Sequence, residues 1–473
     1  MRKQDLPIIL RLVADVLYAY GFFLLIPLGI ALLAANTVQA IVFGVEAGTL
    51  VPVCWFVRHR TSSEGAHKRH AAMALGLAWT ILSLVSFVPF LAHGMTLVDA
   101  LFESFSAWTD TGLTMIPQPE QLPLSLSVFR ILVQWVSGLG IVILMLFLYG
   151  PSSRAAQSFF QAEGRFEDFT TSMWHIGRTI VLIYVGYTLV GFLLLWVTGV
   201  PPFHALMHAI TSLSTGGFST NSVGVGVYGA LPSIVAMVLM LCGGISFGSH
   251  HTLVSGDIRK FIRNPEIRAL FVVICGASGL LILEHFLTEG GTANRVLTSV
   301  FYAVSAVSTC GAGTVLPLSQ VPDAAVFTIM LLMISGGAYG STSGALKLWR
   351  LIIVGKVIGR EVKRPFYPEQ AVLPIQMGSN RIHGRTVIQV TAYVLLYLAI
   401  ALAGSLVFML FGHTSLHALF TVFSAQGNVG LNAMPDAMYF GLHPVLKVQL
   451  VLHMLIGRME ILPLLYLLRG LRE

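Results

Sequence analysis

Charged residues are scarce in this sequence. Asp, Glu, Lys and Arg together make up 10 % of its 473 residues, whereas a typical soluble domain carries about 25 %. Hydrophobic residues make up 55 %, and the mean hydropathy is +0.80. The shortage of charge excludes an ordinary soluble domain and indicates a polytopic membrane protein.

Cysteine is also scarce, and no pattern connects the four that are present. Cys54, Cys242, Cys275 and Cys310 lie in separate apolar segments, without a Cys-x-x-Cys pair or a Cys/His spacing. This excludes a disulfide framework and a zinc site. We expect buried free thiols and no covalently bound cofactor.

Apolar runs, in contrast, are abundant, and ten of them reach the roughly 20 residues that cross a bilayer. They lie at 8–34, 36–57, 71–93, 127–149, 179–199, 229–248, 268–287, 324–356 (interrupted), 388–411 and 445–468. The first follows a basic start like that of a signal peptide, but its apolar stretch is too long for a signal core. We expect it to be retained as a transmembrane helix; the alternative is cleavage at Ala34-Ala-Asn-Thr-Val38.

The net charge of +7 reflects membrane topology rather than nucleic-acid binding. If the N-terminus is cytoplasmic, ten spans place 1–11, 58–70, 150–178, 255–268, 347–385 and the C-terminus on the same side. All of the 28 Lys and Arg residues lie there except Arg130, Arg295, Lys447 and Arg458. This positive-inside bias predicts a multi-pass protein of the cell (inner) membrane with both termini cytoplasmic.

One segment occurs four times without a gap. The copies are Ala100–Thr114 (ALFESFSAWTDTGLT), Ala205–Ser219 (ALMHAITSLSTGGFS), Ser299–Gly313 (SVFYAVSAVSTCGAG) and Ala418–Asn432 (ALFTVFSAQGNVGLN). They align the glycines Gly112, Gly217, Gly311 and Gly430, each six residues after a Ser or Thr. A second small or glycine-rich position follows 25–27 residues later, at Gly138, Gly243, Gly336-Gly337 and Gly457.

Each copy predicts a long helix, a short helix, a polar turn at the aligned glycine, and a second long helix. The short helices cannot span a bilayer, so we expect each to dip into the membrane and return. Non-helical backbone at membrane depth is tolerated only where it is buried in protein or lines a water-filled cavity. Four turns facing a common axis meet this condition, and their glycines let carbonyl oxygens approach that axis, as in cation filters.

The predicted fold is therefore all-α, with four pseudo-fourfold helix–pore-helix–helix repeats and two N-terminal transmembrane helices. We divide the chain into the N-terminal pair (1–70) and repeats at 71–150, 151–254, 255–365 and 366–473. The second helix of the third repeat is the interrupted one.

The repeat segments resemble the Trk/Ktr/HKT superfamily of potassium transporters. The resemblance rests on Thr109–Thr114, Ser214–Ser219, Gly427–Asn432 and Gly457–Pro463, and the two extra N-terminal spans make the chain more similar to the TrkH branch. It implies potassium uptake, a filter glycine in each repeat, and a homodimer that binds a cytoplasmic nucleotide-binding subunit of the TrkA/KtrA type. Besides membrane lipid it implies no other partner, and we expect no nucleic acid.

Carried over to this sequence, the resemblance assigns K⁺ contacts, chiefly through backbone carbonyls, to two residues in each repeat. These are Thr111 and Gly112, Gly216 and Gly217, Cys310 and Gly311, and Val429 and Gly430. The third copy departs from the family pattern, because Cys310 stands where a hydroxyl residue is expected. Glycine at all four aligned positions favours K⁺, but the cysteine leaves the degree of selectivity open.

The eighth span contains a run rich in glycine and hydroxyl residues, Ser335–Ala345. Each interior glycine costs a helix roughly 1 kcal/mol relative to alanine, so the helix should break here. The alternative is close packing of small residues between helices. With the resemblance, we expect a gate below the filter formed by Gly336, Gly337, Gly340, Ser341, Thr342, Ser343 and Gly344.

Arg458 is the only cation that we place deep inside a span, where a charge is costly and usually faces a cavity or partner. Glu460 points elsewhere on a helix, so we expect Arg458 to bind carbonyls of the 336–344 loop and to hinder cations there. The alternative is a structural ion pair. Glu103, near the first turn, is expected either to bond backbone behind the filter or to be an ordinary solvated or paired carboxylate.

Two other functions compete with a gated pore. A proton- or sodium-coupled symporter would need an ionisable relay near the midplane, and only Arg458 and Glu103 suggest one. An intramembrane serine protease is suggested by Gly276-Ala-Ser-Gly279 with His285 as base, but it leaves the fourfold repeat without a role. We expect no enzymatic activity.

Overall fold

The computed structural model describes residues 5–63, 68–140, 173–289, 293–368, 370–371, 373–378 and 380–459. Within these residues most of the chain is helical, and the two strands β1 (Gln376–Met377) and β2 (Asn380–Arg381) form a single short hairpin. All four cysteines are free thiols. Cys54 and Cys310 are buried, as predicted, whereas Cys242 is half-buried and Cys275 is exposed. The all-α fold expected from the sequence is confirmed.

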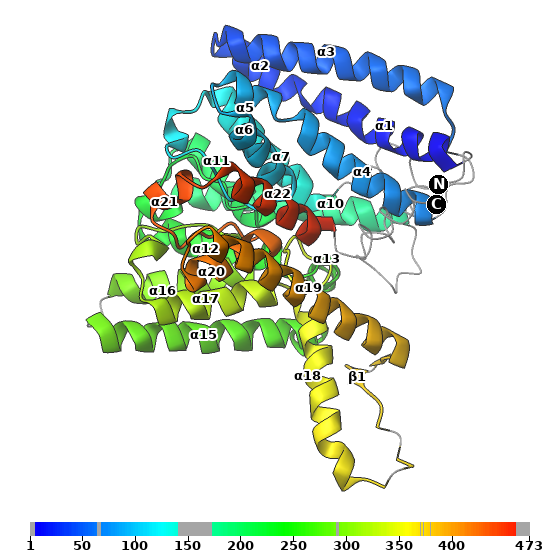
Figure 1. Cartoon of the computed structure of the whole chain (residues 1–473), viewed down its shortest axis with the longest axis vertical. Coiled ribbons are helices and arrows are strands. Elements are labelled where there is room, and N and C mark those ends of the chain that lie inside the picture. The colour runs from blue at the N-terminus through cyan, green and yellow to red at the C-terminus, as the bar shows by residue number, and fades with distance from the viewer. Residues whose placement is uncertain are drawn as a thin grey trace.

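The N-terminal helices lie at one edge of the molecule (Figure 1). They are α1 (Asp5–Phe23), α2 (Leu25–Leu33) and α3 (Thr37–Arg60). Helices α1 and α2 follow one another as a 29-residue apolar stretch, and α3 returns beside them. Asn36 caps α3 by accepting a hydrogen bond from the backbone N–H of Gln39, a common way to satisfy a helix N-terminus.

Four helical units follow, each with a short helix between two longer segments. The first contains α4 (Lys68–Val85), α5 (Val88–Ala92), α6 (Leu97–Trp108) and α7 (Leu124–Leu139); the second contains α10 (Met173–Val197), α11 (Pro202–Ser214), α12 (Ala230–Gly244) and α13 (Phe247–Val254). After α14 (Ile258–Arg263), the third contains α15 (Pro265–Glu289), α16 (Ala293–Val307), α17 (Asp323–Ser335) and α18 (Leu348–Lys363). The fourth contains α19 (Gly384–Leu410), α20 (Ser415–Gln426), α21 (Asp436–Phe440) and α22 (Pro444–Met459).

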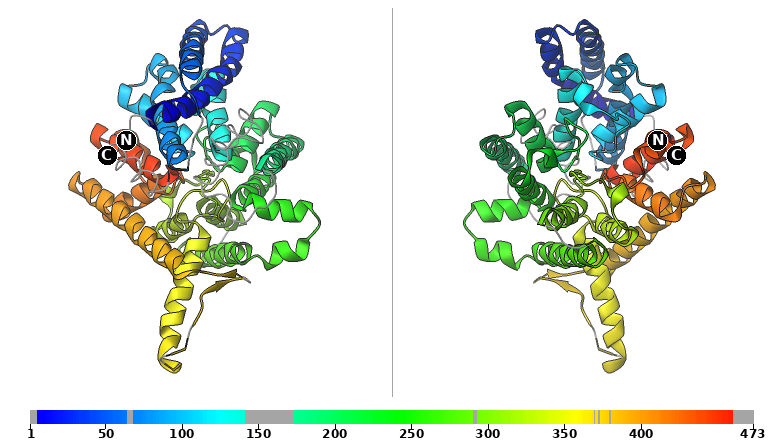
Figure 2. Two further views of the ribbon diagram at one scale, coloured as in Figure 1. Left: turned by 90° about the vertical axis from the view of Figure 1, so that its right-hand side faces the viewer. Right: turned by 90° about the vertical axis from the view of Figure 1, so that its left-hand side faces the viewer.

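The 3-10 turns η1 (Pro119–Gln121), η2 (Val225–Tyr228), η3 (Leu318–Gln320) and η4 (Arg364–Phe366) complete the helical elements. Figure 2 shows the cyan, green, yellow-green and orange-red units arranged around one central region. This is the pseudo-fourfold arrangement that the sequence repeat predicted.

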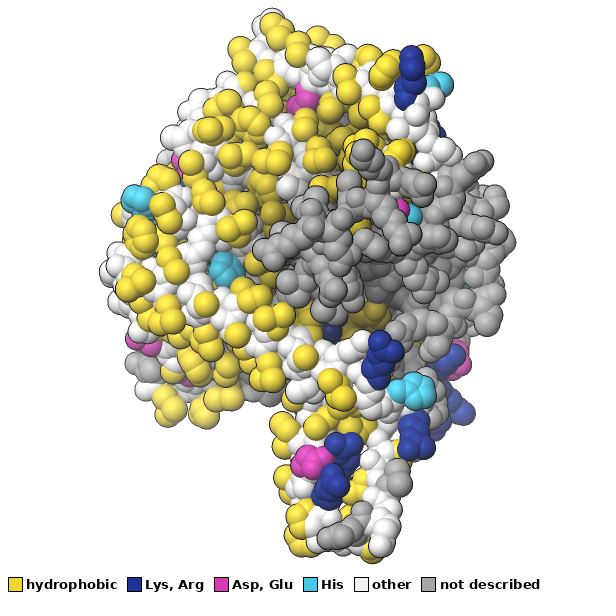
Figure 3. Space-filling model, turned by 45° about the vertical axis from the view of Figure 1, so that its right-hand side comes forward, with side chains coloured by type: hydrophobic (Ala, Val, Ile, Leu, Met, Phe, Trp, Pro, Cys, Tyr) yellow, Lys and Arg dark blue, Asp and Glu magenta, His cyan; other side chains and the backbone are white. Residues whose placement is uncertain are grey.

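Six helical stretches in the described residues are long and apolar enough to cross a membrane, and the bent pair α12–α13 makes a seventh. The other three of the ten predicted spans do not appear as complete helices in the described residues. The run 324–356 is broken between α17 and α18, and the runs 127–149 and 445–468 extend beyond the described residues. The space-filling view shows a broad apolar face, with Lys and Arg gathered on the projection formed by α18 and the β hairpin (Figure 3).

A chain of buried hydrogen bonds ties the N-terminal helices to the first unit. The Trp108 indole donates to Ser86 Oγ, Ser86 donates to the Tyr20 hydroxyl, and Tyr20 donates to Glu46 Oε1, each over 2.8 Å. An indole N–H can only donate, so every donor in the chain points toward Glu46. Trp108 is the last residue of α6, and the chain therefore anchors that helix to α1 and α3.

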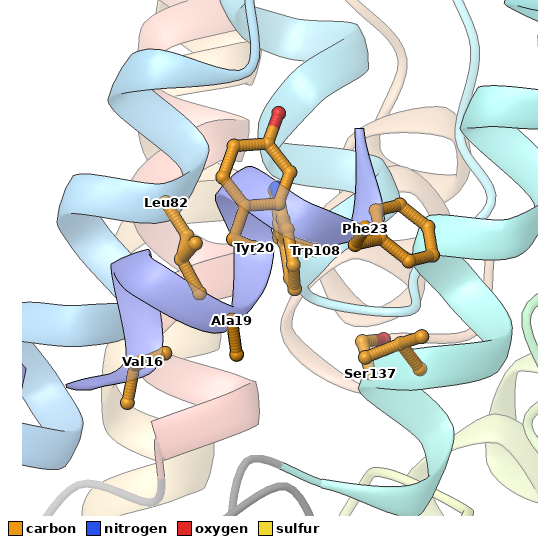
Figure 4. A pocket seen from close by; sticks show the side chains of 8 residues that line it. Val16, Ala19, Tyr20, Phe23, Leu82, Trp108 and Ser137 are labelled. Carbon is orange, nitrogen blue, oxygen red and sulfur yellow. The ribbon is translucent and has the colours of Figure 1, made fainter. Parts of the chain in front are cut away.

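A small cavity of about 50 Å³ lies beside this chain, and Tyr20, Trp108 and Ser137 are among the residues that line it (Figure 4). Its other lining residues are apolar: Val16, Ala19, Phe23, Leu82 and Val136. The cavity lies between α1 and α7. Besides the hydrogen-bond chain, Gln39 Nε2 donates to the Pro89 carbonyl over 3.2 Å and His70 Nε2 lies 3.1 Å from Asp5 Oδ1, so the N-terminal helices also contact the first unit away from Tyr20.

Tyr20→Phe should lower the free energy of unfolding by about 1–3 kcal/mol, because Glu46 loses its donor and Ser86 loses its acceptor inside the protein. Thermal unfolding of the purified protein in detergent, followed by tryptophan fluorescence, measures this change. Glu46→Gln is the control, since it keeps an acceptor oxygen without a charge and should unfold at the wild-type temperature or above. A Tyr20→Phe protein as stable as wild type would contradict the anchoring role.

Candidate functional site

Four glycines, one from each unit, meet at the centre of the molecule. Gly112, Gly217, Gly311 and Gly430 have positive φ values between 69° and 93°. A Cβ atom on any of them would overlap a carbonyl oxygen of the next unit: Gly112 with Gly216, Gly217 with Cys310, Gly311 with Val429, and Gly430 with Thr111. The fourth unit thus contacts the first, and the turns close into a ring. We call these glycines and the four carbonyls the glycine ring.

The residues two positions before these glycines form the same helix end in all four units. Asp110, Thr215, Thr309 and Asn428 have φ between 50° and 60°, a left-handed conformation that costs non-glycine residues about 1–2 kcal/mol. The next backbone N–H donates to the carbonyl six positions before the glycine, over 2.9–3.0 Å in each copy. This is the Schellman type of helix C-terminus, with polar residues where glycine is usual. This shared helix end was not predicted from the sequence.

The aligned hydroxyls six residues before the glycines have different roles. Ser305 donates to the Ala312 carbonyl over 2.9 Å, and Ser424 donates to the Leu431 carbonyl over 2.6 Å. Each bond spans the turn and fixes the strand just after the glycine. Thr211 instead bonds within its own helix, to the His208 carbonyl at 3.4 Å.

The glycine-rich segment interrupts the eighth span, as predicted. Helix α17 ends at Ser335, α18 begins at Leu348, and the 336–344 loop between them is not helical. Ala338 N–H donates to the Gly244 carbonyl over 2.8 Å, and Thr342 N–H donates to the Gly243 carbonyl over 3.1 Å. Ser341, Thr342 and Ser343 are at most 2 % exposed, so the loop is packed inside the bundle.

Two of the left-handed residues bind this loop directly. Thr215 Oγ1 lies 3.0 Å from Thr342 Oγ1, and the Gly344 N–H donates to Thr309 Oγ1 over 2.8 Å. The loop is therefore joined to the second and third turns of the glycine ring through the residues that carry backbone strain.

Arg458 reaches the same region from α22. Its guanidinium donates to the carbonyls of Thr342, over 3.3 Å, and of Ser137, and Nη1 lies 3.9 Å from Asp110 Oδ2. The expected contact between Arg458 and the 336–344 loop is thus present. An ion pair, the alternative expected for Arg458, is present as well, although its partner Asp110 on the first turn was not predicted. Glu460 lies outside the described residues.

Asn428 occupies the corresponding place in the fourth turn. Its Nδ2 donates to Thr111 Oγ1 and to the Met454 carbonyl, each over 2.9 Å. The first bond links the fourth turn to the first across the closure of the ring. Cys310, the departure in the third copy, is fully buried with Sγ 3.7 Å from the Thr211 carbonyl.

Arg458 is not the only deeply buried cation, so that expectation was wrong. Arg130 on α7 is 1 % exposed and pairs with Glu103, Nη2 to Oε2, at 3.4 Å. Its guanidinium also lies 3.9 Å from the centroid of the Phe218 ring, a cation–π contact. In the sequence, Arg130 is one of four exceptions to the positive-inside bias, and no local pattern identifies Glu103 as its partner.

Glu103 supports the first turn from behind, as one of its two expected roles required. Its Oε1 accepts hydrogen bonds from the Thr114 hydroxyl and the Met115 N–H, both at 2.5 Å. Arg130 also donates to Thr114 Oγ1 over 3.1 Å. The backbone just beyond Gly112 is therefore held by a buried ion pair.

Gln134, also on α7, contacts the second turn and was not predicted. Its Nε2 donates to the Gly216 carbonyl, and its Oε1 accepts from the Phe218 N–H at 3.2 Å. The side chain is completely buried. A long amide among apolar residues has no distinctive sequence pattern, so only the structure identifies it.

The protease pair is not brought together. Ser278 and His285 lie on the same helix, α15, seven residues apart, which is about 10 Å along a helix axis. The imidazole Nδ1 is 3.0 Å from the Leu281 carbonyl. This geometry does not form a nucleophile–base pair.

The chain is similar in sequence and in fold to known cation transporters. The sequence model of the TrkH family, described as cation transport protein, matches residues 37–471. An uncharacterized cation transporter of Methanocaldococcus jannaschii is 29 % identical over 472 residues, covering 99 % of this chain and 96 % of the relative. The Trk system potassium uptake protein TrkH of Salmonella typhimurium is 30 % identical over 88 % of each chain. The crystal structure of the potassium transporter TrkH from Vibrio parahaemolyticus superposes with a TM-score of 0.85, 26 % identity and 99 % coverage of both chains.

Arg130→Met should destabilise the protein by about 3–5 kcal/mol, because it leaves Glu103 as an unpaired buried charge. Adding Glu103→Gln should recover at least half of that loss, since glutamine still accepts from Met115 without a charge. Thermal unfolding in detergent of the two single variants and the double variant measures the coupling. Purely additive losses would show that the pair does not act as one unit.

Proposed function

The chain belongs to the TrkH family of cation transport proteins, and from that premise we propose that it takes up potassium across the cytoplasmic membrane through the glycine ring. The observation that carries the proposal is the closure of the ring, in which four backbone carbonyls from four repeats converge against four glycines. Such carbonyls replace the hydration shell of a monovalent cation. The mechanism is permeation and needs no covalent chemistry.

We assign the ion contacts to the residue before each aligned glycine and to the glycine itself. They are Thr111, Gly112, Gly216, Gly217, Cys310, Gly311, Val429 and Gly430. The short helices α6, α11, α16 and α20 end at the ring, so the partial negative charge of each helix C-terminus also favours a cation there.

The 336–344 loop and Arg458 form the gate in this proposal. The loop is buried beside the turns and Arg458 holds it through the Thr342 carbonyl. A fixed positive charge close to the ion path opposes cation passage. Opening requires the loop to leave its contacts with Thr215 and Thr309, and Arg458 to release Thr342.

The remaining assignments follow the family resemblance. We propose a homodimer in the inner membrane, both termini cytoplasmic, bound to a nucleotide-binding regulatory subunit of the TrkA/KtrA type. The repeats are assigned to 71–150, 151–254, 255–365 and 366–473, after the N-terminal pair 1–70. The basic projection formed by α18 and the hairpin (Figure 3) fits a cytoplasmic location under the positive-inside rule.

A proton- or sodium-coupled symporter is the alternative mechanism. A relay would use a carboxylate near the ion path, but Glu103 and Asp110 are each placed beside an arginine in the described residues. Uptake by proteoliposomes with and without an imposed proton gradient separates the two. Flux that requires the gradient would favour the symporter.

Gly217→Ser should abolish uptake or reduce its selectivity, because the side chain would run into the Cys310 carbonyl and the glycine has φ of +76°. The measurement is rubidium-86 uptake by proteoliposomes, competed by K⁺, Na⁺ and Li⁺. Gly229→Ser is the matched control: its φ is +100°, but no atom lies within 4 Å of its Cβ position. Equal effects of the two substitutions would count against the ring as the filter.

Arg458→Ala should raise the basal uptake rate roughly ten- to a hundredfold, since a hydrogen bond to a charged group contributes about 1.5–3 kcal/mol. Deletion of 338–344 should act in the same direction. Arg458→Lys keeps the charge but loses the planar two-carbonyl contact, and should fall between. Unchanged or lower flux in well-folded Arg458→Ala protein would refute the gate.

A further inference from the structure

The four carbonyls of the glycine ring are not equivalent. The Gly216 carbonyl accepts a hydrogen bond from Gln134 Nε2. Among the described residues, the carbonyls of Thr111, Cys310 and Val429 accept none from a side chain or from the backbone. One ligand of the ring is therefore tethered to the protein, and three are not.

The tether is doubly attached and its orientation is fixed. The backbone N–H of Phe218 can only donate and the Gly216 carbonyl can only accept, so the amide oxygen of Gln134 must face Phe218 and its NH₂ group must face Gly216. The two bonds flank Gly217 on both sides. Because Gln134 belongs to α7, the first unit holds the filter strand of the second.

This contact explains a departure in the sequence repeat. The residue before the aligned glycine carries a side chain in three copies, Thr111, Cys310 and Val429, but is Gly216 in the second. A Cβ on Gly216 would collide with the Gln134 amide and with the Asp110 carboxylate. The space used elsewhere by a side chain is occupied here by Gln134.

The positions equivalent to Gln134 in the second and fourth units carry methionine. Gly138 packs against Ser214 and Gly244 against Ser308, each three residues before the aligned glycine of the next unit. Four residues earlier stand Gln134 and Met240. Gly457 of the fourth unit and Gly243 of the second each pack against the carbonyl four positions before the aligned glycine of their own unit. This makes Met454 the counterpart of Met240. Methionine has the length of glutamine but neither hydrogen bond.

We propose that Gln134 is a selectivity-determining residue, which holds the Gly216 carbonyl and the Phe218 amide at the spacing that suits K⁺. This inference rests on the proposed filter. To bind a smaller cation the carbonyls must move inward, and the tether opposes that movement on one side of the ring. Without it, the second strand can close around Na⁺ or Li⁺. Gln134 acts through Gly216 and is a positioning residue rather than an ion ligand.

The test compares Gln134→Met with wild type in rubidium-86 uptake by proteoliposomes, measuring the concentrations of Na⁺ and Li⁺ that halve uptake relative to K⁺. We expect the preference for K⁺ over Na⁺ and Li⁺ to fall about tenfold in Gln134→Met, equivalent to about 1.4 kcal/mol. Gln449→Met is the matched control, because Gln449 Nε2 also donates to a backbone carbonyl, that of Gly404 at 2.7 Å, away from the ring. Its discrimination should equal that of wild type.

A second readout does not require an open pore. Ions that bind the folded state raise its unfolding temperature, so K⁺ should stabilise the wild-type protein in detergent more than Na⁺ does, and this difference should shrink in Gln134→Met. Gln134→Glu keeps the acceptor for the Phe218 N–H, so its difference between stabilisation by K⁺ and by Na⁺ should be intermediate. If Gln134→Met is not recovered folded, the same comparison of Gln134→Glu with wild type provides the test.

The outcomes separate this inference from the proposed filter. Wild-type discrimination that survives in the Gln134 variants overturns the role of Gln134 and leaves the filter intact. A wild-type protein with no preference for K⁺ in either readout overturns the filter, and the inference with it. Loss of discrimination in Gln449→Met as well would show that the effect is general weakening and would also overturn the proposal.

Discussion

The structure depends on one constraint: four backbone carbonyls must be presented together at the centre of an apolar bundle. The chain meets it by closing four turns into a ring, so that each carbonyl lies against the glycine of the preceding repeat. The surrounding helices provide the rest. A residue in the left-handed conformation follows the end of every short helix. The side chain of each of these residues except Asn428 contacts the 336–344 loop or Arg458.

Because one chain supplies all four turns, each is supported in its own way. The first is held by the Glu103–Arg130 pair, the second by Gln134, and the third and fourth by hydroxyls that bond across the turn. A channel made of four identical subunits could not differ in this way. The ring is fourfold in backbone geometry, but its support is not symmetric, and a single substitution alters only a quarter of it.

Much of this was predictable from sequence, and the limit has a physical cause. Gapless spacing located the four glycines, and the density of glycine in Ser335–Ala345 located the break in the helix, because both signals are local. Arg130, Gln134 and the left-handed residue Thr309 were missed because their roles depend on partners far along the chain: Gln134 meets Gly216 across 82 residues. The equivalence of Asp110 and Asn428 is a property of backbone dihedrals, which side-chain identity does not reveal.

The hydrogen-bond chain that ends at Glu46 also bears on how the protein enters the membrane during synthesis. Helices α1 and α3 precede the first repeat in the sequence, and Tyr20 lies 26 residues before Glu46. The carboxyl group therefore has its donor as soon as the two helices form a hairpin. An intramembrane carboxylate is costly in lipid until it is partnered. The N-terminal hairpin therefore supplies the hydrogen-bond donor for Glu46 from within itself. Ser86 and Trp108 complete the network only when the first repeat has been made and packs against the hairpin.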